Sequence, residues 1–368
     1  TIGLVPALAA SGDPDLPEIT AQELVEKIAA SDEQRLSGTL KISTDLGIPS
    51  FGGLTDSLLP GGAGGADRSS AAPEDRLTEL ASGTHTLRLA ADGPDRQRLS
   101  VLGKGTEYSI VHNGDDVWAY DSGSDKVFHQ RAEGGAEDGA AHQAVPGTPK
   151  EMAEKALAAV GDTTSVTVDG TARVAGRDAY QLLIKPKQSG STVGSVRVAV
   201  DAENGLPLKF TLAPSGGGKA VVDAGFTHVD FAKPDASAFS FTPPKGAVVT
   251  EADELAEDAN DQSAGAFHKD LAGLGDLGSV NVIGEGWTSV AEIDAAGGAA
   301  GLTGADTTGV PTEALGLLGS FGDKVTGDFG TGTVFRTRLV NALLTDDGKV
   351  YVGAVTKDAL VKAADTAR

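Results

Sequence analysis

The sequence predicts an α+β protein built on one large, curved antiparallel sheet, followed by a small C-terminal α+β module. About ten segments alternate apolar and polar residues with a period of two, which is typical of strands with one buried face. Only two segments before residue 250 carry clear helix-start signals, so regular alternation of strands and helices is not predicted. An acidic run at 251–261 then separates this region from a C-terminal part in which strand-like and helical segments are mixed.

The strands are most evident where alternating segments flank a turn dipeptide. Leu36–Ser43 has apolar side chains or glycine at every second position, which predicts a strand with one buried face. Asn113-Gly114 and Asn204-Gly205 each favour a tight hairpin turn, because both residues tolerate positive φ. Thr333–Leu344 is expected to pair with Lys349–Val355 as a late hairpin.

Two helices are predicted from their first turns. Thr20 and Glu23 have the spacing of a capping box, in which each side chain accepts a hydrogen bond from the other residue's amide. Thr148 and Glu151 repeat this spacing, with Pro149 at the first helical position, where its missing N–H costs nothing. A final helix is expected to begin near Thr356.

These patterns divide the chain into four parts. Residues 1–17 are expected to be a signal-peptide remnant or a flexible N-terminus, and 18–250 the main domain. Residues 251–262 are an acidic linker, and 263–368 form the small module. Ala7-Leu8-Ala9 fits a small-x-small cleavage pattern. We therefore expect an extracytoplasmic protein, exported and either soluble or tethered at the membrane by its N-terminus; an ordinary flexible terminus is the alternative.

Composition and missing motifs argue against several functions. The 30 basic and 52 acidic residues give a net charge of −22, which disfavours nucleic-acid binding. The absence of cysteine excludes disulfides, thiol catalysis and thiolate metal sites in this sequence. There is no Gly-x-Ser-x-Gly elbow, and the six histidines are scattered without a metal-ligand spacing. We therefore predict no catalytic residue, no metal and no cofactor, while an enzyme with an unrecognised site stays open.

Three motifs resemble those of a known family. Asp116–Asp121 (Asp-Val-Trp-Ala-Tyr-Asp), followed by Ser-Gly-Ser-Asp-Lys-Val, resembles a strand and turn of the LolA-like lipoprotein-carrier superfamily. Val198–Asp201 with Asn204–Leu208 resembles a hairpin of that superfamily and of its relatives, the RseB/MucB-like sigma-factor regulators. Phe239–Gly246 resembles the closing segment of the family. The resemblance covers about residues 20–250, in the expected order.

The resemblance implies a strongly bent half-barrel covered by helices around an apolar cavity. The same alternating residues could instead be ordinary core, filled by their own neighbours. Glycine-rich segment 45–76 is expected to be a flap over the cavity mouth, with a family-variable surface insertion as the alternative. The predicted flap residues are Leu46, Ile48, Phe51, Leu54, Leu58 and Leu59. The predicted cavity residues are Leu40, Ile42, Leu87, Leu89, Leu99, Val101, Trp118, Tyr120 and Ile184.

The resemblance leaves two functions beside the unrecognised enzyme. The first is a non-catalytic extracytoplasmic binder of lipid or acylated protein, acting as a lipoprotein carrier or chaperone, whose partners are lipid or lipoprotein acyl chains. The second is an envelope-stress or sigma-factor regulatory sensor, which contacts a membrane-anchored anti-sigma factor.

Overall fold

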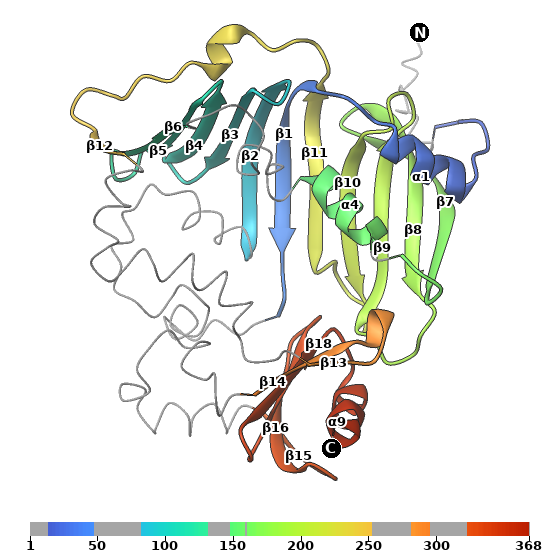
Figure 1. Ribbon diagram of the computed structural model, residues 1–368. Coiled ribbons are helices and arrows are strands. Elements are labelled where there is room, and N and C mark those ends of the chain that lie inside the picture. The colour runs from blue at the N-terminus through green and yellow to red at the C-terminus, as the bar shows by residue number, and fades with distance from the viewer. Residues whose placement is uncertain are drawn as a thin grey trace, which may run out of the picture.

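The computed structural model describes residues 14–47, 82–131, 148–158, 160–251, 281–294 and 322–367 (Figure 1). Most of them form one twelve-stranded sheet, and the C-terminal part forms a six-stranded sheet. The strands of the large sheet are β1 Arg35–Thr44, β2 Gly83–Asp92, β3 Arg96–Leu102, β4 Glu107–Asn113, β5 Asp116–Asp121, β6 Lys126–Arg131, β7 Thr164–Val174, β8 Arg177–Pro186, β9 Val193–Asp201, β10 Pro207–Pro214, β11 Val222–Asp230 and β12 Val248–Glu251.

The large sheet is bent and open. Its strand order is β12-β6-β5-β4-β3-β2-β1-β11-β10-β9-β8-β7, so β12 and β7 are edges that do not pair with each other. All neighbours are antiparallel except β12, which runs parallel to β6. The pairing of β1 with β11 joins two meanders into one curved surface (Figure 1). The prediction of a large curved antiparallel sheet with few helices is confirmed.

Both helices of this part begin at the predicted residues. Helix α1 (Ala21–Ala29) has the full capping box: the Glu23 amide donates to Thr20 Oγ1 at 3.2 Å, and the Thr20 amide donates to Glu23 Oε2 at 2.8 Å. Helix α4 spans Pro149–Ala158, and the Glu151 amide donates to Thr148 Oγ1 at 3.2 Å. These local contacts satisfy amides that the first turn of a helix leaves unpaired.

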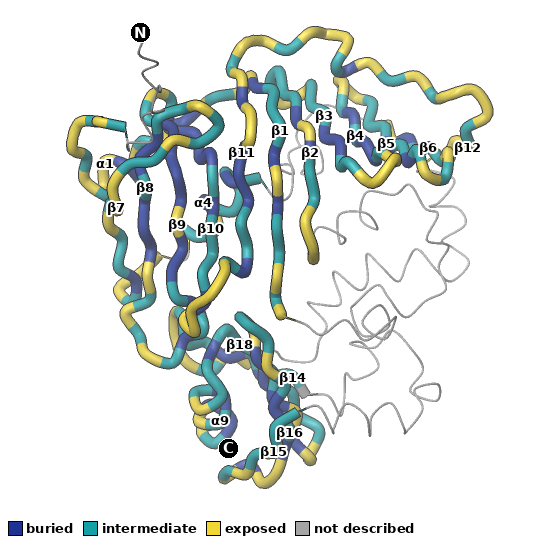
Figure 2. Tube along the Cα trace, turned by 180° about the vertical axis from the view of Figure 1, so that it is seen from behind, coloured by how far each residue is buried: buried dark blue, intermediate teal, exposed yellow. Residues whose placement is uncertain are grey.

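The two helices pack on the concave face of the sheet. Helix α1 lies on β7 and β8, and α4 on β9 and β10 (Figure 1). Figure 2 shows that buried residues concentrate along the middle of β8–β10. We call the side chains buried under these helices the helix-covered cluster: Leu24, Ile28, Ala153, Tyr180, Leu182, Ile184, Val196, Val198, Val200 and Phe210. Because burying a large aliphatic side chain contributes roughly 1.5–3 kcal/mol, this cluster anchors the fold.

Asp201, at the end of β9, organises the β9–β10 hairpin. It has no exposed surface, and it accepts two hydrogen bonds from Arg177, at 2.5 Å from Nε and 3.0 Å from Nη2. The backbone amides of Glu203 and Asn204 donate to the same carboxylate at 2.9 and 3.0 Å. Burial alone would raise the pKa of Asp201, but these hydrogen bonds outweigh it and hold the pKa below its usual value.

Gly205 in the same hairpin has no room for a side chain. Its φ is +77°, and a Cβ there would lie 2.4 Å from the carbonyl oxygen of Lys27 at the end of α1. Glycine at this position therefore allows both the turn and the close approach of the helix. The hairpin motif is a structural feature that joins β9 and β10 to α1.

The six-stranded sheet carries its own core. Its order is β13-β14-β18-β17-β16-β15, and helix α9 (Lys357–Thr366) packs on it, with Thr356 Oγ1 capping its first turn. Its apolar cluster includes Val290, Phe329, Leu343, Tyr351 and Leu360. The strands are β13 Asn281–Ile283, β14 Val290–Asp294, β15 Asp323–Gly327, β16 Gly330–Arg336, β17 Asn341–Thr345 and β18 Lys349–Gly353.

The prediction that Thr333–Leu344 as a whole forms one arm of the late hairpin is wrong, because this range spans parts of two strands, β16 and β17. A turn separates β16 from β17, and the Thr337 hydroxyl builds it by accepting hydrogen bonds from the amides of Leu339 and Val340 at 3.2 and 2.9 Å. Threonine can replace a backbone partner in this way, and the alternation of apolar residues does not reveal it. The predicted hairpin between the following strand and β18 is confirmed.

The two sheets touch through polar contacts and one aromatic side chain. Trp287 packs beside the helix-covered cluster, and its indole N–H donates to Thr164 Oγ1 at 2.8 Å. Arg338 forms an ion pair with Asp45 at 2.7 Å, and Ser191 forms a β-bridge with Val355. Residues 252–280 lie outside the described residues, so the predicted linker and domain boundaries stay predictions. Among the described helices, none combines the length and the apolar character needed to cross a bilayer.

We predict that Arg177→Met destabilises the protein far more than Arg173→Met. Removing Arg177 leaves a buried carboxylate without its cation, which costs about 3 kcal/mol. Arg173 makes a more exposed pair with Asp178 at 2.7 Å, so its loss costs less than about 1 kcal/mol. Urea unfolding at pH 7 measures both values. Equal unfolding free energies for the two variants would contradict this role of Asp201.

We also predict that acid removes the contribution of Asp201. Because its pKa is lowered in the folded state, this stabilisation is complete above the unfolded value of about 3.9 and is lost as the pH falls below it. In Arg177→Met, the two backbone amide donors remain but the guanidinium is lost, so the pKa of Asp201 is expected to rise. The variant should then lose less stability than the wild type between about pH 5 and pH 2 in urea titrations. Parallel losses in the two proteins would refute this.

Candidate functional site

Most of the predicted cavity residues lie together on the concave face. Leu40 pairs with Leu87, Leu87 with Val101, and Leu89 with Leu99, so they project to the same side of β1–β3. Five of the predicted residues are buried in one apolar cluster, and Val101 is half-buried against it. The five are Leu40, Ile42, Leu87, Leu89 and Leu99.

Ile184 lies on the same face but in different surroundings. Register across β8, β9, β10, β11 and β1 places it on the side of Ile42. It belongs to the helix-covered cluster and has no exposed surface. The protein's own helices therefore fill the space above Ile184. This agrees with the alternative in which the alternating residues are ordinary core.

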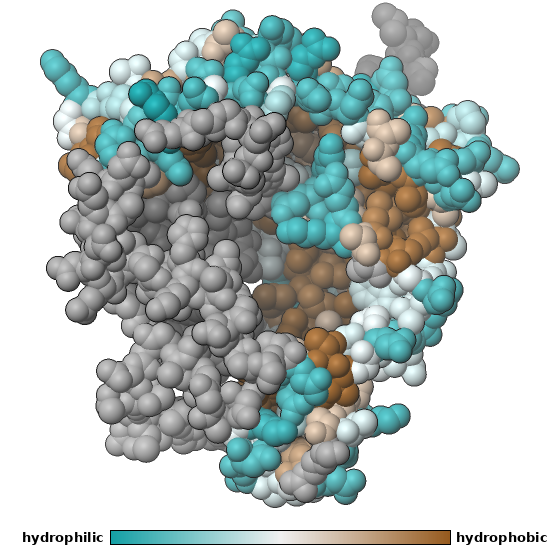
Figure 3. Space-filling model, in the orientation of Figure 1, coloured by the Kyte–Doolittle hydropathy of each residue, from teal (hydrophilic) through white to brown (hydrophobic). Residues whose placement is uncertain are grey.

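An apolar row continues across the other half of the concave face. Leu99 pairs with Ile110, Ile110 with Ala119, and Ala119 with Phe128, which carries the row from β3 to β6. Ile110 and Phe128 are only half-buried. Among the described residues, α-helix packing on the large sheet is concentrated on β7–β10. Figure 3 shows apolar side chains gathered beside and below α4 on the same face, toward the six-stranded sheet.

Trp118 and Tyr120 lie on the opposite, convex face. Tyr120 pairs with Ser109 and Trp118 with Val111, positions that alternate with the concave row. Phe241 packs against both aromatic rings, with centroids 5.6 Å from Trp118 and 5.8 Å from Tyr120. The structure therefore does not bring these two residues together with the other predicted cavity residues. It unites two of the family-like motifs instead, through Phe241.

Phe241 belongs to a segment, residues 232–251, that we call the strap. The strap leaves β11, forms the short helix η2 (Ala236–Phe239) beside β3 and β4, and ends as β12 (Figures 1 and 2). Phe239, 1% exposed, anchors it. The strap thus covers part of the convex face.

His129 fastens the end of the strap. Its Nδ1 lies 2.7 Å from Glu251 Oε2, its Nε2 lies 2.9 Å from Asp116 Oδ1, and its ring stacks on Trp118 at 3.7 Å. Hydrogen bonding to His129, helped by Arg131, holds the pKa of Asp116 below its usual value.

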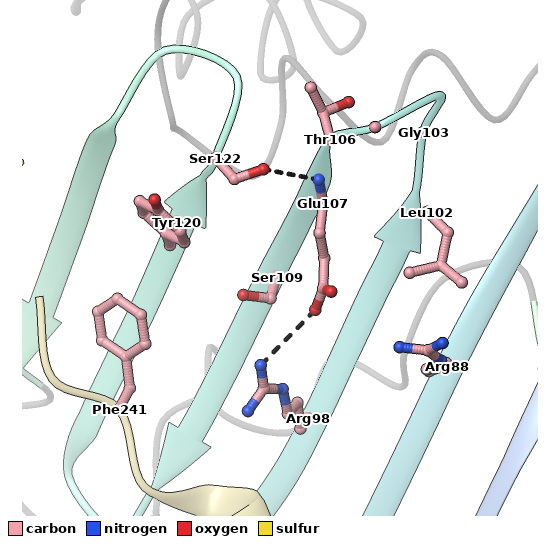
Figure 4. Close-up of a pocket in the computed structure, with 11 residues that line it drawn as sticks. Arg88, Arg98, Leu102, Gly103, Thr106, Glu107, Ser109, Tyr120, Ser122 and Phe241 are labelled. Atoms are coloured by element: carbon pink, nitrogen blue, oxygen red, sulfur yellow. Dashed lines mark hydrogen bonds and ion pairs between the residues drawn. The ribbon is translucent and has the colours of Figure 1, made fainter. Parts of the chain in front are cut away.

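A groove of about 640 Å³ lies on the convex face beside the strap (Figure 4). Sequence reasoning missed it, although Arg88, Arg98 and Ser109 alternate with the apolar residues of their strands. Arg98 lies 3.6 Å from Glu107, whose amide donates to Ser122 Oγ at 2.7 Å. The lining residues are Arg88, Arg98, Leu102, Gly103, Gly105, Thr106, Glu107, Ser109, Tyr120, Ser122 and Phe241.

Only one predicted flap residue lies among the described residues. Leu46 follows β1, and its carbonyl accepts a hydrogen bond from the Arg338 amide at 2.9 Å. Ile48, Phe51, Leu54, Leu58 and Leu59 lie outside the described residues, so the flap stays a prediction. The described ranges contain no group of three His, Asp or Glu side chains placed to hold a metal ion.

Comparisons with known proteins give distant similarities. No curated protein matches the chain. A complex of MucA and MucB from Pseudomonas aeruginosa is 14% identical, with 94% of this chain and 96% of that chain covered and a TM-score of 0.40. A LolA superfamily protein from Nitrosomonas europaea is 11% identical, with 61% and 99% covered and a TM-score of 0.23. An uncharacterized conserved protein from Thermus thermophilus is 12% identical, with 63% and 98% covered and a TM-score of 0.33.

The match to a family model is more specific. Residues 79–245 match the model described as the MucB/RseB N-terminal domain. This range runs from just before β2 to the Phe-x-Phe-x-Pro-Pro segment of the strap, so it contains the first two motifs quoted above and all of the third except Gly246. The predicted resemblance to the RseB/MucB-like relatives of the LolA-like superfamily is therefore confirmed, and residues 79–245 are similar to a MucB/RseB N-terminal domain.

Proposed function

We propose that this chain is a non-catalytic extracytoplasmic binder of lipid or acylated protein. The acyl chain lies along the concave face of β1–β6, beside the buried side chains of Leu40, Leu87 and Leu99 and in contact with the half-buried Val101. The resemblance to envelope carriers and regulators supports an extracytoplasmic location. The proposal rests on one observation above all: the apolar row from Leu99 to Phe128 extends beyond the strands on which the described helices pack.

The chemistry of that row fits a hydrocarbon chain. It consists of aliphatic and aromatic side chains without a polar group, so it offers burial and no hydrogen bond. Each methylene that leaves water contributes about 0.8 kcal/mol, so a contact of about eight methylenes would supply about 6 kcal/mol. The row crosses β3–β6, and neighbouring strands lie about 4.8 Å apart, so its length suits an extended chain of that size.

The second candidate is an envelope-stress or sigma-factor regulatory sensor that binds a membrane-anchored anti-sigma factor. The observation favouring it is that the matching family model is that of MucB/RseB. An apolar segment of such a partner could occupy the same concave face, and the six-stranded sheet offers a further surface. Co-purification of a single anti-sigma partner without bound lipid would favour this candidate.

We predict that Val101→Asn weakens acyl-chain binding while Leu102→Asn does not. The two side chains are neighbours in β3, are both half-buried and point to opposite faces. An amide at position 101 must lose water when the chain binds, which raises the Kd of a fluorescent hexadecanoic acid about tenfold, or about 1.4 kcal/mol. Fluorescence titration measures both variants.

The pair of variants also provides the control for folding. Both should keep the circular-dichroism spectrum and a similar melting temperature, since each replaces one half-buried aliphatic group in the same strand. Equal affinities of the two folded variants, or no binding of the fatty acid by the wild type, would contradict an acyl-chain site on the concave face.

A further inference from the structure

The groove on the convex face contains polar groups that acyl-chain binding does not use. Arg88, Ser100, Ser109 and Tyr120 pair in register across β2–β5, so they form one row on this face. Arg98 lies in the neighbouring row and also lines the groove (Figure 4). Two guanidinium groups therefore face one carboxylate, that of Glu107, in a chain whose net charge is −22.

The hydrogen-bonding capacity of the two arginines is largely unused. Arg88 is exposed and has no ion-pair or hydrogen-bond partner among the described residues. Arg98 makes two long contacts, 3.6 Å to Glu107 Oε1 and 3.4 Å to the carbonyl of Ala238. A guanidinium offers five N–H donors, so several remain available to a ligand in the groove.

Ser109 adds a hydroxyl to the same place. The residue is only 3% exposed and lines the groove, yet its hydroxyl has no hydrogen-bond partner in the described part of the chain. A hydroxyl is both a donor and an acceptor, so this one can hydrogen-bond to a ligand in the groove. Figure 4 shows Ser109 between Tyr120 and the Arg98–Glu107 pair.

Aromatic and apolar groups form the rest of the wall. Tyr120 and Phe241 stand on one side and Leu102 on the other (Figure 4). The Tyr120 hydroxyl donates a hydrogen bond to Asp125 at 2.9 Å. Because this bond engages the hydroxyl, Tyr120 offers a ligand the face of its ring. A volume of about 640 Å³ is within the range of pockets that hold small organic ligands.

We propose that this groove binds an organic phosphate, with the phosphoryl oxygens on Arg88, Arg98 and Ser109. The aromatic or apolar body of the ligand rests against Tyr120, Phe241 and Leu102. Two guanidinium groups and a hydroxyl present more donors than a carboxylate's two oxygens can use in one plane, whereas a phosphate monoester presents three oxygens and up to two charges. Free organic phosphates and lipid headgroups share this chemistry.

Phenyl phosphate is the direct probe, measured by isothermal titration calorimetry with the whole chain. We expect wild-type binding that weakens as salt is raised, and a loss of about tenfold or more in Arg88→Met. The matched control is Arg96→Met, which removes the same charge from the same hairpin, outside the groove, where Arg96 pairs with Asp92 at 2.5 Å. Its affinity should stay within about twofold of the wild type.

Two further variants test the roles of the other groups. Ser109→Ala should weaken phenyl phosphate several-fold, and Glu107→Gln should tighten it, because the competing carboxylate is removed. Arg88→Met should leave fatty-acid affinity on the concave face unchanged. The phosphate site and the proposed acyl-chain function can therefore be rejected independently of each other.

Vesicles of phosphatidylglycerol, with phosphatidylcholine as the neutral comparison, identify the source of the phosphate. Binding of phosphatidylglycerol vesicles that depends on Arg88 assigns the site to a lipid headgroup, and binding of phenyl phosphate alone assigns it to a free organic phosphate. No binding of either, or equal affinities in Arg88→Met and Arg96→Met, would overturn the proposal.

Discussion

The alternation of side chains in an open sheet is the constraint on which the whole molecule depends. Successive residues of a strand face opposite sides, so twelve strands produce two large surfaces that must each be covered or used. On the concave side, α1 and α4 cover β7–β10 and bury Ile184 completely. The apolar row from Leu99 to Phe128 continues past them, and the proposed acyl site follows from this unequal cover.

On the convex side, the strap covers part of the sheet. Phe239 is buried, Phe241 packs on Trp118 and Tyr120, and Glu251 meets His129 at the end of the strap. The cover leaves a groove in which arginine and serine side chains remain accessible. The two faces of β2–β5 therefore offer different chemistry, hydrocarbon on one side and anion recognition on the other, separated by the thickness of one sheet.

The parts of the fold that depend on neighbours in sequence could be predicted. The capping boxes at Thr20 and Thr148, the turn at Asn113-Gly114 and the shared face of Leu87 and Leu89 are all properties of a few consecutive residues. The position of Trp118 required the register between strands, and the groove required Phe241 to return over β5 from far along the chain. Neither is contained in a local pattern, and the Thr337 turn was hidden because its hydroxyl replaces a backbone partner.

The most direct test of the account is to locate a bound acyl chain. A hexadecanoic acid with a diazirine near its methyl end, bound to the whole protein and irradiated, marks the side chains it touches, and peptide mass spectrometry identifies them. The account predicts adducts on the concave face, at Val101, Ile110 or Phe128, residues of the apolar row and its edge. Adducts confined to the convex side, at Leu102, Tyr120 or Phe241, or no adduct at a saturating concentration, would contradict it.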